Sequence, residues 1–453
     1  MKENDIYNTE IVDNGMNFEG ISKIDGITTF VNNAIISEKI KVKIKKVKKT
    51  YALGDILEII ERSSYRQNPI CDVYDKCGGC SCQHIDYDFT LKLKKNIVEN
   101  VLKKMQINYK KIDNCIGMGF PYYYRNKVQY PVRVDKNGNI KMGFYEKNSH
   151  EVVENKCCFI QDRTIDIMAE NVFNKLIELG FNGYNEKNNT GDIRHIVIRR
   201  GYNTSEIMVI LVINNEKLLN DIRFNKIVDF LKKIKDVKSI VLNVNNSNTN
   251  EILGKLSKTI YGTEYITEII GEYKYLISSK SFFQVNTIQA EMLYNTLLEG
   301  LNLTKSEVVF DLYSGVGSIG IFLSNYVSKV YGIEIEPEAV KMANENIKIN
   351  NIKNCEYIAG SVENKIEEFK NKNIKPDVIV VDPPRKGLDD KSIKYILEFE
   401  PEKIGYVSCN PATLARDLKK LEEKYDIYKI TPVDMFPQTS HVETVVCLKC
   451  KKN

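Results

Sequence analysis

The chain has 453 residues, of which 43% are hydrophobic, and its formal net charge is +5. This length exceeds what one ordinary core accommodates, so we expect two to three domains. No run of about 18 apolar residues occurs, and the first residues lack the basic-then-apolar pattern of a secretion signal, so we expect a cytoplasmic protein that does not bind a membrane. Eleven cysteines in such a protein indicate metal ligands, catalytic thiols or core residues rather than disulfides.

Residues 1 to 62 contain short alternating segments separated by Gly15, Gly20 and Gly26, which predicts a small antiparallel β-barrel. Residues 39–45 alternate strictly between lysine and an aliphatic residue, so one face of this strand is apolar and the other carries lysines. Such a stripe is commonly a plain solvated face. It also suits the phosphate backbone of RNA, which we favour because of the motifs that follow.

A dense group of four cysteines comes next, at Cys71, Cys77, Cys80 and Cys82. Gly78 and Gly79 permit the tight backbone turn that lets neighbouring thiolates converge on one centre. The fourth ligand of a metal centre would be Cys82 or one member of the remote pair Cys157 and Cys158. Structural zinc usually shows paired Cys-x-x-Cys units, whereas an iron–sulfur cluster uses one dense group and one remote cysteine. The spacing therefore favours the cluster over zinc and over four core cysteines.

Residues 90 to 106 have apolar side chains at helical spacing with lysines between them, which predicts an amphipathic helix. Residues 116 to 262 read as strands and helices of an α+β domain. Five basic residues lie beside tyrosines in this region, at Arg125, Lys127, Arg194, Arg199 and Arg200. They suit a surface that stacks bases and neutralises phosphates, or they are arginines on the solvent side of ordinary strands.

The final third alternates strands with helices. Five strands are predicted near residues 307–310, 327–333, 355–358, 377–381 and 403–407. Two more, at 428–433 and 442–448, follow each other with no helix between them, so the last strand can pair antiparallel. This pattern predicts a doubly wound, mostly parallel α/β sheet with its ligand site at the carboxyl ends of the strands.

A glycine-rich turn follows the first of these strands. Gly315, Gly317 and Gly320 match G-x-G-x-x-G, which permits the close approach of a nucleotide, and Glu334 lies near the position where an acid binds ribose hydroxyls. By itself the motif does not separate NAD from S-adenosylmethionine. The closing antiparallel strand and the turn at Asp382 favour the methyl donor, because they resemble class I methyltransferases rather than dehydrogenases.

Cys409 is predicted to lie on a strand-to-helix turn. The apolar residues 404–407 form a buried strand, Asn410 is a good helix N-cap, and Pro411 is tolerated at the first helical position. The partial positive charge of the helix start favours a thiolate, which suits a nucleophile. The alternative is a buried cysteine, a common fate of this residue.

Together these motifs make the chain resemble the RNA uridine-5 methyltransferase family. The resemblance covers nearly the whole chain, and its specific motifs occur in the expected order: SFFQVN (281–286), DLYSGVGSIG (311–320), DPPRKG (382–387), SCNPATLARD (408–417) and HVETV (441–445). It implies a class I, Rossmann-like methyltransferase domain over residues 263–453, a central domain over 63–262, and a TRAM-like β-barrel over 1–62. The helix at 90–106 is expected to pack on the catalytic domain.

The resemblance also implies roles for individual residues. Cys409 is the implied nucleophile and Glu443 the implied base, while S-adenosylmethionine is bound by Gln284, Tyr313, Gly315, Ser318, Glu334, Ser361 and Asp382. The cluster-bearing branch of the family implies a [4Fe-4S] cluster on Cys71, Cys77, Cys80 and Cys158. The chain departs from the family at Ser361, where many members have Asp, and at Ser37-Glu38, where a Pro-Gly-Glu turn is common.

The implied activity is methylation of uridine carbon 5 in RNA. The cluster and the barrel favour 23S ribosomal RNA as the substrate. We also expect the protein to be a monomer. Transfer RNA is the alternative substrate, and a non-catalytic RNA-binding or redox-sensing protein is the alternative function.

Overall fold

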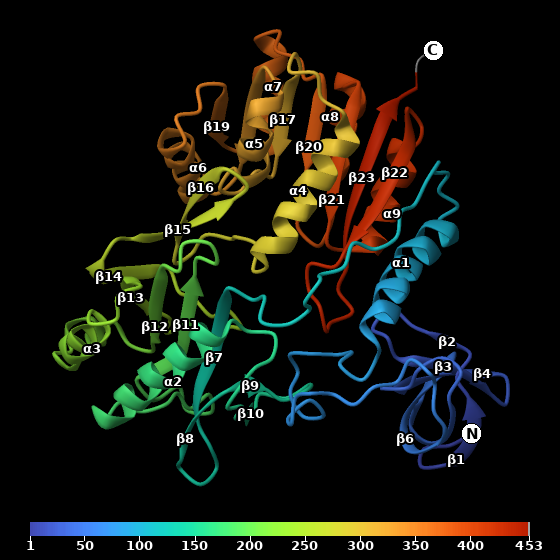
Figure 1. Ribbon diagram of the computed structural model, residues 1–453, viewed down its shortest axis with the longest axis vertical. Helices are drawn as coiled ribbons and strands as arrows, with labels where there is room; N and C mark the ends of the chain where they lie inside the picture. The colour runs from blue at the N-terminus through green and yellow to red at the C-terminus, as the bar shows by residue number, and fades with distance from the viewer. Residues whose placement is uncertain (452–453) are drawn as a thin grey trace.

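The computed structural model describes residues 1–451. The chain forms three β-sheet regions that follow one another in sequence, coloured blue, green and orange to red in Figure 1. Among the described residues, no helix combines the length and the apolar character needed to cross a membrane.

The N-terminal region is a six-stranded sheet in the order β1-β5-β6-β4-β3-β2. Its strands are β1 (Ile6–Glu10), β2 (Asp13–Asn14), β3 (Gly20–Ile24), β4 (Ile27–Asn32), β5 (Lys39–Val47) and β6 (Tyr51–Glu61). β5 alternates as predicted, with Ile40, Val42 and Ile44 buried and the lysines outside. The prediction of purely antiparallel pairing is wrong, because β4 and β6 run parallel. Two lysines of the stripe, Lys39 and Lys45, form ion pairs across the sheet, each at 3.0 Å.

The central region is a six-stranded mixed sheet in the order β14-β13-β12-β11-β7-β8. These strands are β7 (Lys127–Val134), β8 (Ile140–Met142), β11 (Ile193–Arg200), β12 (Ile207–Ile213), β13 (Val237–Val244) and β14 (Leu256–Gly262). The small pair β9 (Phe144–Tyr145) and β10 (Val152–Val153) lies beside them. Helices α2 (Arg163–Glu178) and α3 (Arg223–Leu231) cover one face through a shared apolar core, and η1 (Glu216–Asn220) precedes α3 (Figure 1).

The C-terminal region is a seven-stranded sheet in the order β19-β18-β17-β20-β21-β23-β22. Its strands are β17 (Val308–Leu312), β18 (Lys329–Glu334), β19 (Cys355–Ala359), β20 (Val378–Val381), β21 (Lys403–Ser408), β22 (Tyr425–Val433) and β23 (Glu443–Cys450). Neighbouring strands from β19 to β21 are parallel, and β23 runs antiparallel to both β21 and β22. The predicted doubly wound sheet with a reversed last strand is therefore confirmed.

Helices cover both faces of this sheet (Figure 1). They are α4 (Thr287–Leu301), α5 (Ser318–Leu323), η2 (Ser324–Tyr326), α6 (Pro337–Ile349), α7 (Val362–Asn371), α8 (Asp390–Phe399) and α9 (Pro411–Leu421). A hairpin of β15 (Tyr265–Ile270) and β16 (Tyr273–Ser278) adds side chains to the core that contains α4.

Helix α1 (Tyr87–Lys104) begins earlier than the predicted residue 90, because Asp86 caps it by accepting a hydrogen bond from the Phe89 N–H. Its apolar face packs into the same core as α9 and β22. A fully buried ion pair joins Lys94 of α1 to Asp434, with Nζ and Oδ1 2.5 Å apart. The segment after α1 then runs along β22, forming parallel bridges from Tyr109, Ile112 and Ile116. Residues that precede the central sheet in sequence thus pack on the C-terminal region.

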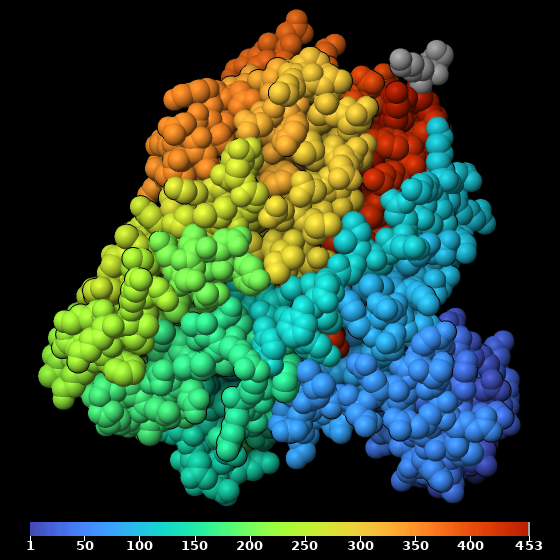
Figure 2. Space-filling model, in the orientation of Figure 1, coloured from blue at the N-terminus to red at the C-terminus, as the bar shows by residue number. Residues whose placement is uncertain are grey.

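A groove separates the N-terminal sheet from the loops at residues 75–81 and 144–148. In Figure 2 the blue N-terminal surface stands apart from the green central surface low on this face. Phe30 and Tyr51 line the groove with their rings in an edge-to-face arrangement, and Lys147 lies on the opposite wall.

Candidate active site

Four neighbouring parallel strands place the predicted site residues at one edge of the sheet. Tyr313 follows β17, Asp382 follows β20, Cys409 follows β21, and Glu334 is the last residue of β18. Leu312 is paired with both Ile333 and Val381, and Val381 with Tyr406, so these strands end level with one another. The carboxyl ends of parallel strands are where α/β sheets bind ligands.

The reversed strand β23 brings Glu443 to the same edge. Ser408 is paired with Thr444 across β21 and β23, so Cys409 and Glu443 each lie one residue from the same pair, on adjacent strands. The charge of Glu443 acts on the Cys409 thiol, which places the two side chains within electrostatic range of each other. Residues 34 positions apart in sequence therefore face one site.

The local structure around Cys409 is the predicted one. Asn410 caps α9, accepting a hydrogen bond from the Ala412 N–H at 3.0 Å, with Pro411 in the first turn. The local backbone lowers the pKa of the Cys409 thiol, in the direction expected of a helix start, but larger effects oppose it. The pKa of the Cys409 thiol is raised to about 11, first by burial and then by the charges of Glu443 and Asp382. Only Arg385 and the local backbone oppose these effects.

Asp382 and Glu443 are two carboxyl groups with strongly raised pKa values. Burial raises the pKa of Asp382 to about 7, and burial together with the Asp382 charge raises that of Glu443 to about 8. Within residues 1–451, no hydrogen bond or ion pair reaches either carboxyl group. Glu443 is buried and Asp382 is half-buried. A buried carboxylate without a partner is costly, and such groups occur where a ligand supplies the missing charge.

The glycine-rich turn is held open by its backbone. Gly315 and Gly317 have φ angles of +55° and +81°, which side chains rarely tolerate. The Gly315 N–H donates to Glu334 Oε2 at 2.9 Å, and Glu336 N–H donates to Oε1 at 3.0 Å, so this carboxylate is fixed at the mouth of the turn. The buried Ser314 hydroxyl has no partner among the described residues.

The remaining predicted donor-binding residues lie on four other segments of the chain. Gln284 lies in the extended segment before α4, and its carbonyl accepts a hydrogen bond from Asn126 Nδ2 at 3.1 Å. Tyr313 has a left-handed backbone, φ +62°, and its hydroxyl lies 2.9 Å from Ser392 Oγ. Ser318 is the first residue of α5. Ser361 follows β19 and caps α7, because its hydroxyl accepts a bond from the Asn364 N–H at 3.4 Å.

Cys71, Cys77, Cys80 and Cys158 line one small cavity together with Tyr74 and Phe144. Cys82 points instead into the core beside α1, and Cys157 does not line the cavity. Over residues 1–451, no three His, Cys, Asp or Glu side chains are grouped as the ligands of a single metal ion. The four cysteines thus share one cavity without the close convergence that one zinc ion requires.

Several residues that sequence reasoning missed or misplaced also bear on the site. Asp311, whose pKa burial raises to about 7, accepts the Gly320 N–H at 3.0 Å and so anchors the start of α5. Asp311 is the first residue of the motif DLYSGVGSIG, so the sequence contained a signal that could have identified it. The prediction of solvent-facing arginines is wrong for Arg194 and Arg199, which are 4% and 5% exposed.

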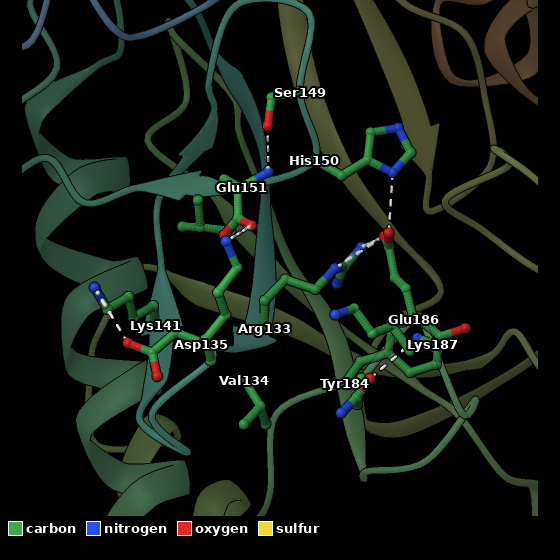
Figure 3. Close-up of a pocket in the computed structure, with 13 residues that line it drawn as sticks. Arg133, Val134, Asp135, Lys141, Ser149, His150, Glu151, Tyr184, Glu186 and Lys187 are labelled. Atoms are coloured by element: carbon green, nitrogen blue, oxygen red, sulfur yellow. Dashed lines mark hydrogen bonds and ion pairs between the residues drawn. The ribbon is translucent and has the colours of Figure 1, made fainter.

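A separate cavity lies at the far end of the central sheet (Figure 3). Arg133 and His150 both point to Glu186, with Nε to Oε1 3.1 Å and Nδ1 to Oε2 2.9 Å, and Lys141 points to Asp135. Its acids and bases are mutually paired, unlike Asp382 and Glu443.

Comparison with known proteins identifies the family to which the chain belongs. Residues 86–451 match the family described as tRNA (Uracil-5-)-methyltransferase. The chain belongs to this family. An uncharacterized RNA methyltransferase of Clostridium acetobutylicum is 46% identical, covering 99% of this chain and 98% of that protein. An uncharacterized RNA methyltransferase of Oceanobacillus iheyensis is 42% identical, covering 100% of this chain and 98% of that protein.

A solved structure resembles nearly the whole chain. The Pyrococcus abyssi tRNA (uracil-54, C5)-methyltransferase, in complex with S-adenosyl-L-homocysteine, matches with a TM-score of 0.76 and 28% identity over 98% of this chain and 100% of that chain. That coverage includes most of the N-terminal sheet. The expectation that this sheet separates ribosomal from transfer-RNA enzymes therefore loses its basis.

The residues at this edge fit S-adenosylmethionine, the methyl donor of the family. The glycine turn leaves room for a nucleoside, Glu334 is fixed beside it, and the carboxyl groups of Asp382 and Glu443 have no paired cation. A positively charged sulfur bound near these carboxyl groups would lower their pKa values, since the ionised form of each would gain an attractive partner.

The raised pKa of Glu443 predicts a pH-dependent stability. In the unfolded chain this carboxyl ionises near its ordinary pKa of 4.5, but in the folded protein only near 8. The free energy of unfolding therefore falls as pH rises from about 4.5 to 8 and stays low above that range. Glu443→Gln removes this penalty, so in thermal unfolding of the donor-free protein its Tm should exceed that of the unaltered protein by roughly 5 °C at pH 9 and by little at pH 5.

Glu402→Gln, at an exposed glutamate just before β21, is the matched control and should change Tm equally at both pH values. An equal effect of Glu443→Gln at pH 5 and pH 9 would contradict the raised pKa.

Proposed function

We propose that the protein transfers a methyl group from S-adenosylmethionine to carbon 5 of uridine in RNA, with Cys409 as nucleophile and Glu443 as base. The observation that carries the proposal is the pairing of β21 with β23, which sets a cysteine and an unpartnered glutamate beside Asp382 at the ligand edge of the sheet. We propose that Gln284, Tyr313, Gly315, Ser318, Glu334, Ser361 and Asp382 bind the donor.

The chemistry explains why these residue types are needed. Carbon 5 of uracil is a poor nucleophile, and addition of the Cys409 thiolate to carbon 6 converts the ring to an enolate that is nucleophilic at carbon 5. S-adenosylmethionine would supply, when bound, a methyl group on a positively charged sulfur, and carbon 5 would take this methyl group as S-adenosylhomocysteine leaves. The Glu443 carboxylate then removes the proton from carbon 5, the bond between Sγ and carbon 6 breaks, and the Cys409 thiolate leaves.

Access to the ring sets a second requirement. Both carbons are shielded when the uridine is stacked in a helix, so the base must be unstacked before Cys409 reaches it. We propose that the central region and the N-terminal sheet, a TRAM-like module, supply the RNA contacts that offset this cost. A non-catalytic RNA-binding or redox-sensing role does not account for Cys409 and Glu443 at one site.

Two variants separate the proposed roles. Cys409→Ala should abolish methylation of RNA by more than about a thousandfold while leaving donor binding intact, because it removes the covalent step and little volume. Glu443→Gln should allow addition and methyl transfer but block elimination, leaving protein covalently joined to RNA on a denaturing gel. Normal turnover by Glu443→Gln with no adduct would show that another group is the base.

We propose that Cys71, Cys77, Cys80 and Cys158 hold a [4Fe-4S] cluster. The thiolates of a cluster bind different iron atoms, so they need one shared cavity rather than convergence on a single ion, and that is how the four side chains are placed. The proposed role is structural, because methyl transfer from a sulfonium to an enolate needs no electron.

Anaerobically purified protein should be brown and contain about four irons per chain, and Cys77→Ala should lose both properties. Cys82→Ala is the matched control, since Cys82 lies in the same stretch but outside the cavity, and it should retain the iron. Zinc in place of iron would refute the cluster.

We propose 23S ribosomal RNA as the substrate, acted on by a cytoplasmic monomer, because the proposed cluster belongs to the family's ribosomal branch. Transfer RNA is a second candidate, favoured by the likeness to the Pyrococcus abyssi enzyme. Mapping 5-methyluridine in both RNAs, with and without the gene, decides between them. We expect the modification to disappear from 23S ribosomal RNA, and loss confined to transfer RNA would overturn this choice.

A further inference from the structure

Three cations stand together where the central sheet meets the proposed active site. Lys127 begins β7, Arg199 lies opposite it on β11 as its register partner, and Arg125 precedes Lys127 by two residues. Opposite residues of an antiparallel pair share one face of the sheet, so the side chains of Lys127 and Arg199 lie together. In Figure 1, β7 and β11 are neighbours below the segment that leads into α4.

No carboxylate compensates these charges. Within residues 1–451, none of the three cations forms an ion pair, whereas the next arginine, Arg200, is paired with Asp162 at 2.8 Å. Arg199 is 5% exposed and its buried Nε lacks a hydrogen-bond partner, as does Nε of Arg125. The pKa of Lys127 is lowered to about 7 by burial and then by the charges of Arg199 and Arg125.

Like charges placed opposite each other in a sheet and partly withdrawn from water destabilise the folded protein. The arrangement therefore indicates a site for an anion, whose charge would remove the repulsion and whose oxygens would accept the unpaired N–H groups.

The cations border the segment that we propose to bind the donor. Arg199 Nη2 donates to the Ser281 carbonyl at 2.5 Å. Asn126, between Arg125 and Lys127, donates from its N–H to the Val285 carbonyl at 2.8 Å and from Nδ2 to the Gln284 carbonyl at 3.1 Å. An anion held here is thus one short segment away from Gln284.

We propose that Arg125, Lys127 and Arg199 form a binding site for a backbone phosphate of the RNA strand that carries the target uridine. The inference rests on the proposed function, which supplies a polyanionic strand at this place. A phosphate fits the unpaired donors, and its fixed position next to an unstacked uridine would hold the strand in register with Cys409. The carboxylate of the methyl donor is the competing source of an anion.

The test measures RNA binding without methyl transfer. Lys127→Met removes the charge and keeps most of the volume, and Arg125→Gln is a second variant at a half-buried position. Lys394→Met, at a residue of α8 whose side chain is 73% exposed, is the control. The probes are a short mixed-sequence single-stranded RNA, titrated from 50 to 200 mM salt, and S-adenosyl-L-homocysteine.

Each site variant should weaken RNA binding about fivefold at 0.1 M salt and reduce the slope of log K against log salt by about 0.7, the value for one phosphate contact with a single strand. The affinity of the site variants for S-adenosyl-L-homocysteine should be unchanged, and Lys394→Met should bind RNA as the unaltered protein does. Lys127→Met should unfold at the same or a higher temperature.

An unchanged RNA affinity and slope in the site variants would overturn the site. Lost affinity for S-adenosyl-L-homocysteine with RNA binding intact would also overturn it. The binding titration does not depend on turnover. Failure of the unaltered protein to form 5-methyluridine would therefore contradict the proposed function and leave the phosphate site to be judged by RNA binding alone.

Discussion

The reversal of one strand is the constraint on which the site depends. In a purely parallel sheet, every carboxyl end lies at one edge and every amino end at the other. Because β23 runs antiparallel between β21 and β22, its first residue, Glu443, lies at the edge where β21 ends before Cys409. The fold thereby combines a side chain from the beginning of one strand with side chains from the ends of four others. It also buries Glu443 close enough to the half-buried Asp382 that burial and the Asp382 charge together raise the pKa of Glu443.

Local signals in the sequence predicted local structure well. The Asn410-Pro411 pair marked the start of α9, and the lysine alternation of residues 39–45 marked the inner and outer faces of β5. Properties that depend on distant residues were harder. The pKa of Cys409 is raised by burial and then by the charges of Glu443 and Asp382, which outweigh the effect of its own helix start. The parallel pairing of β4 with β6 depends on a crossover that no local pattern encodes. The proximity of Cys409 and Glu443 followed only from resemblance to a family.

A single short segment connects the cysteine cavity to the proposed donor site. Tyr123 N–H donates to the Phe159 carbonyl and Arg125 N–H to the Ile160 carbonyl, directly after Cys158. One residue later, Asn126 is bonded to the segment that carries Gln284. A rigid group in the cavity would therefore fix the segment that carries Arg125 relative to the one that carries Gln284, which would be a mechanical role for the cavity.

The buried pair of Lys94 and Asp434 has a consequence for how the protein folds during its synthesis. The two residues are separated by 340 positions in the chain. At a synthesis rate of about 5 to 20 residues per second, Lys94 is synthesised roughly 20 to 70 seconds before its partner. During that interval α1 has no C-terminal sheet to pack on. When the helix docks, Lys94 must meet Asp434, because an ammonium group buried in the core without a compensating charge would be costly.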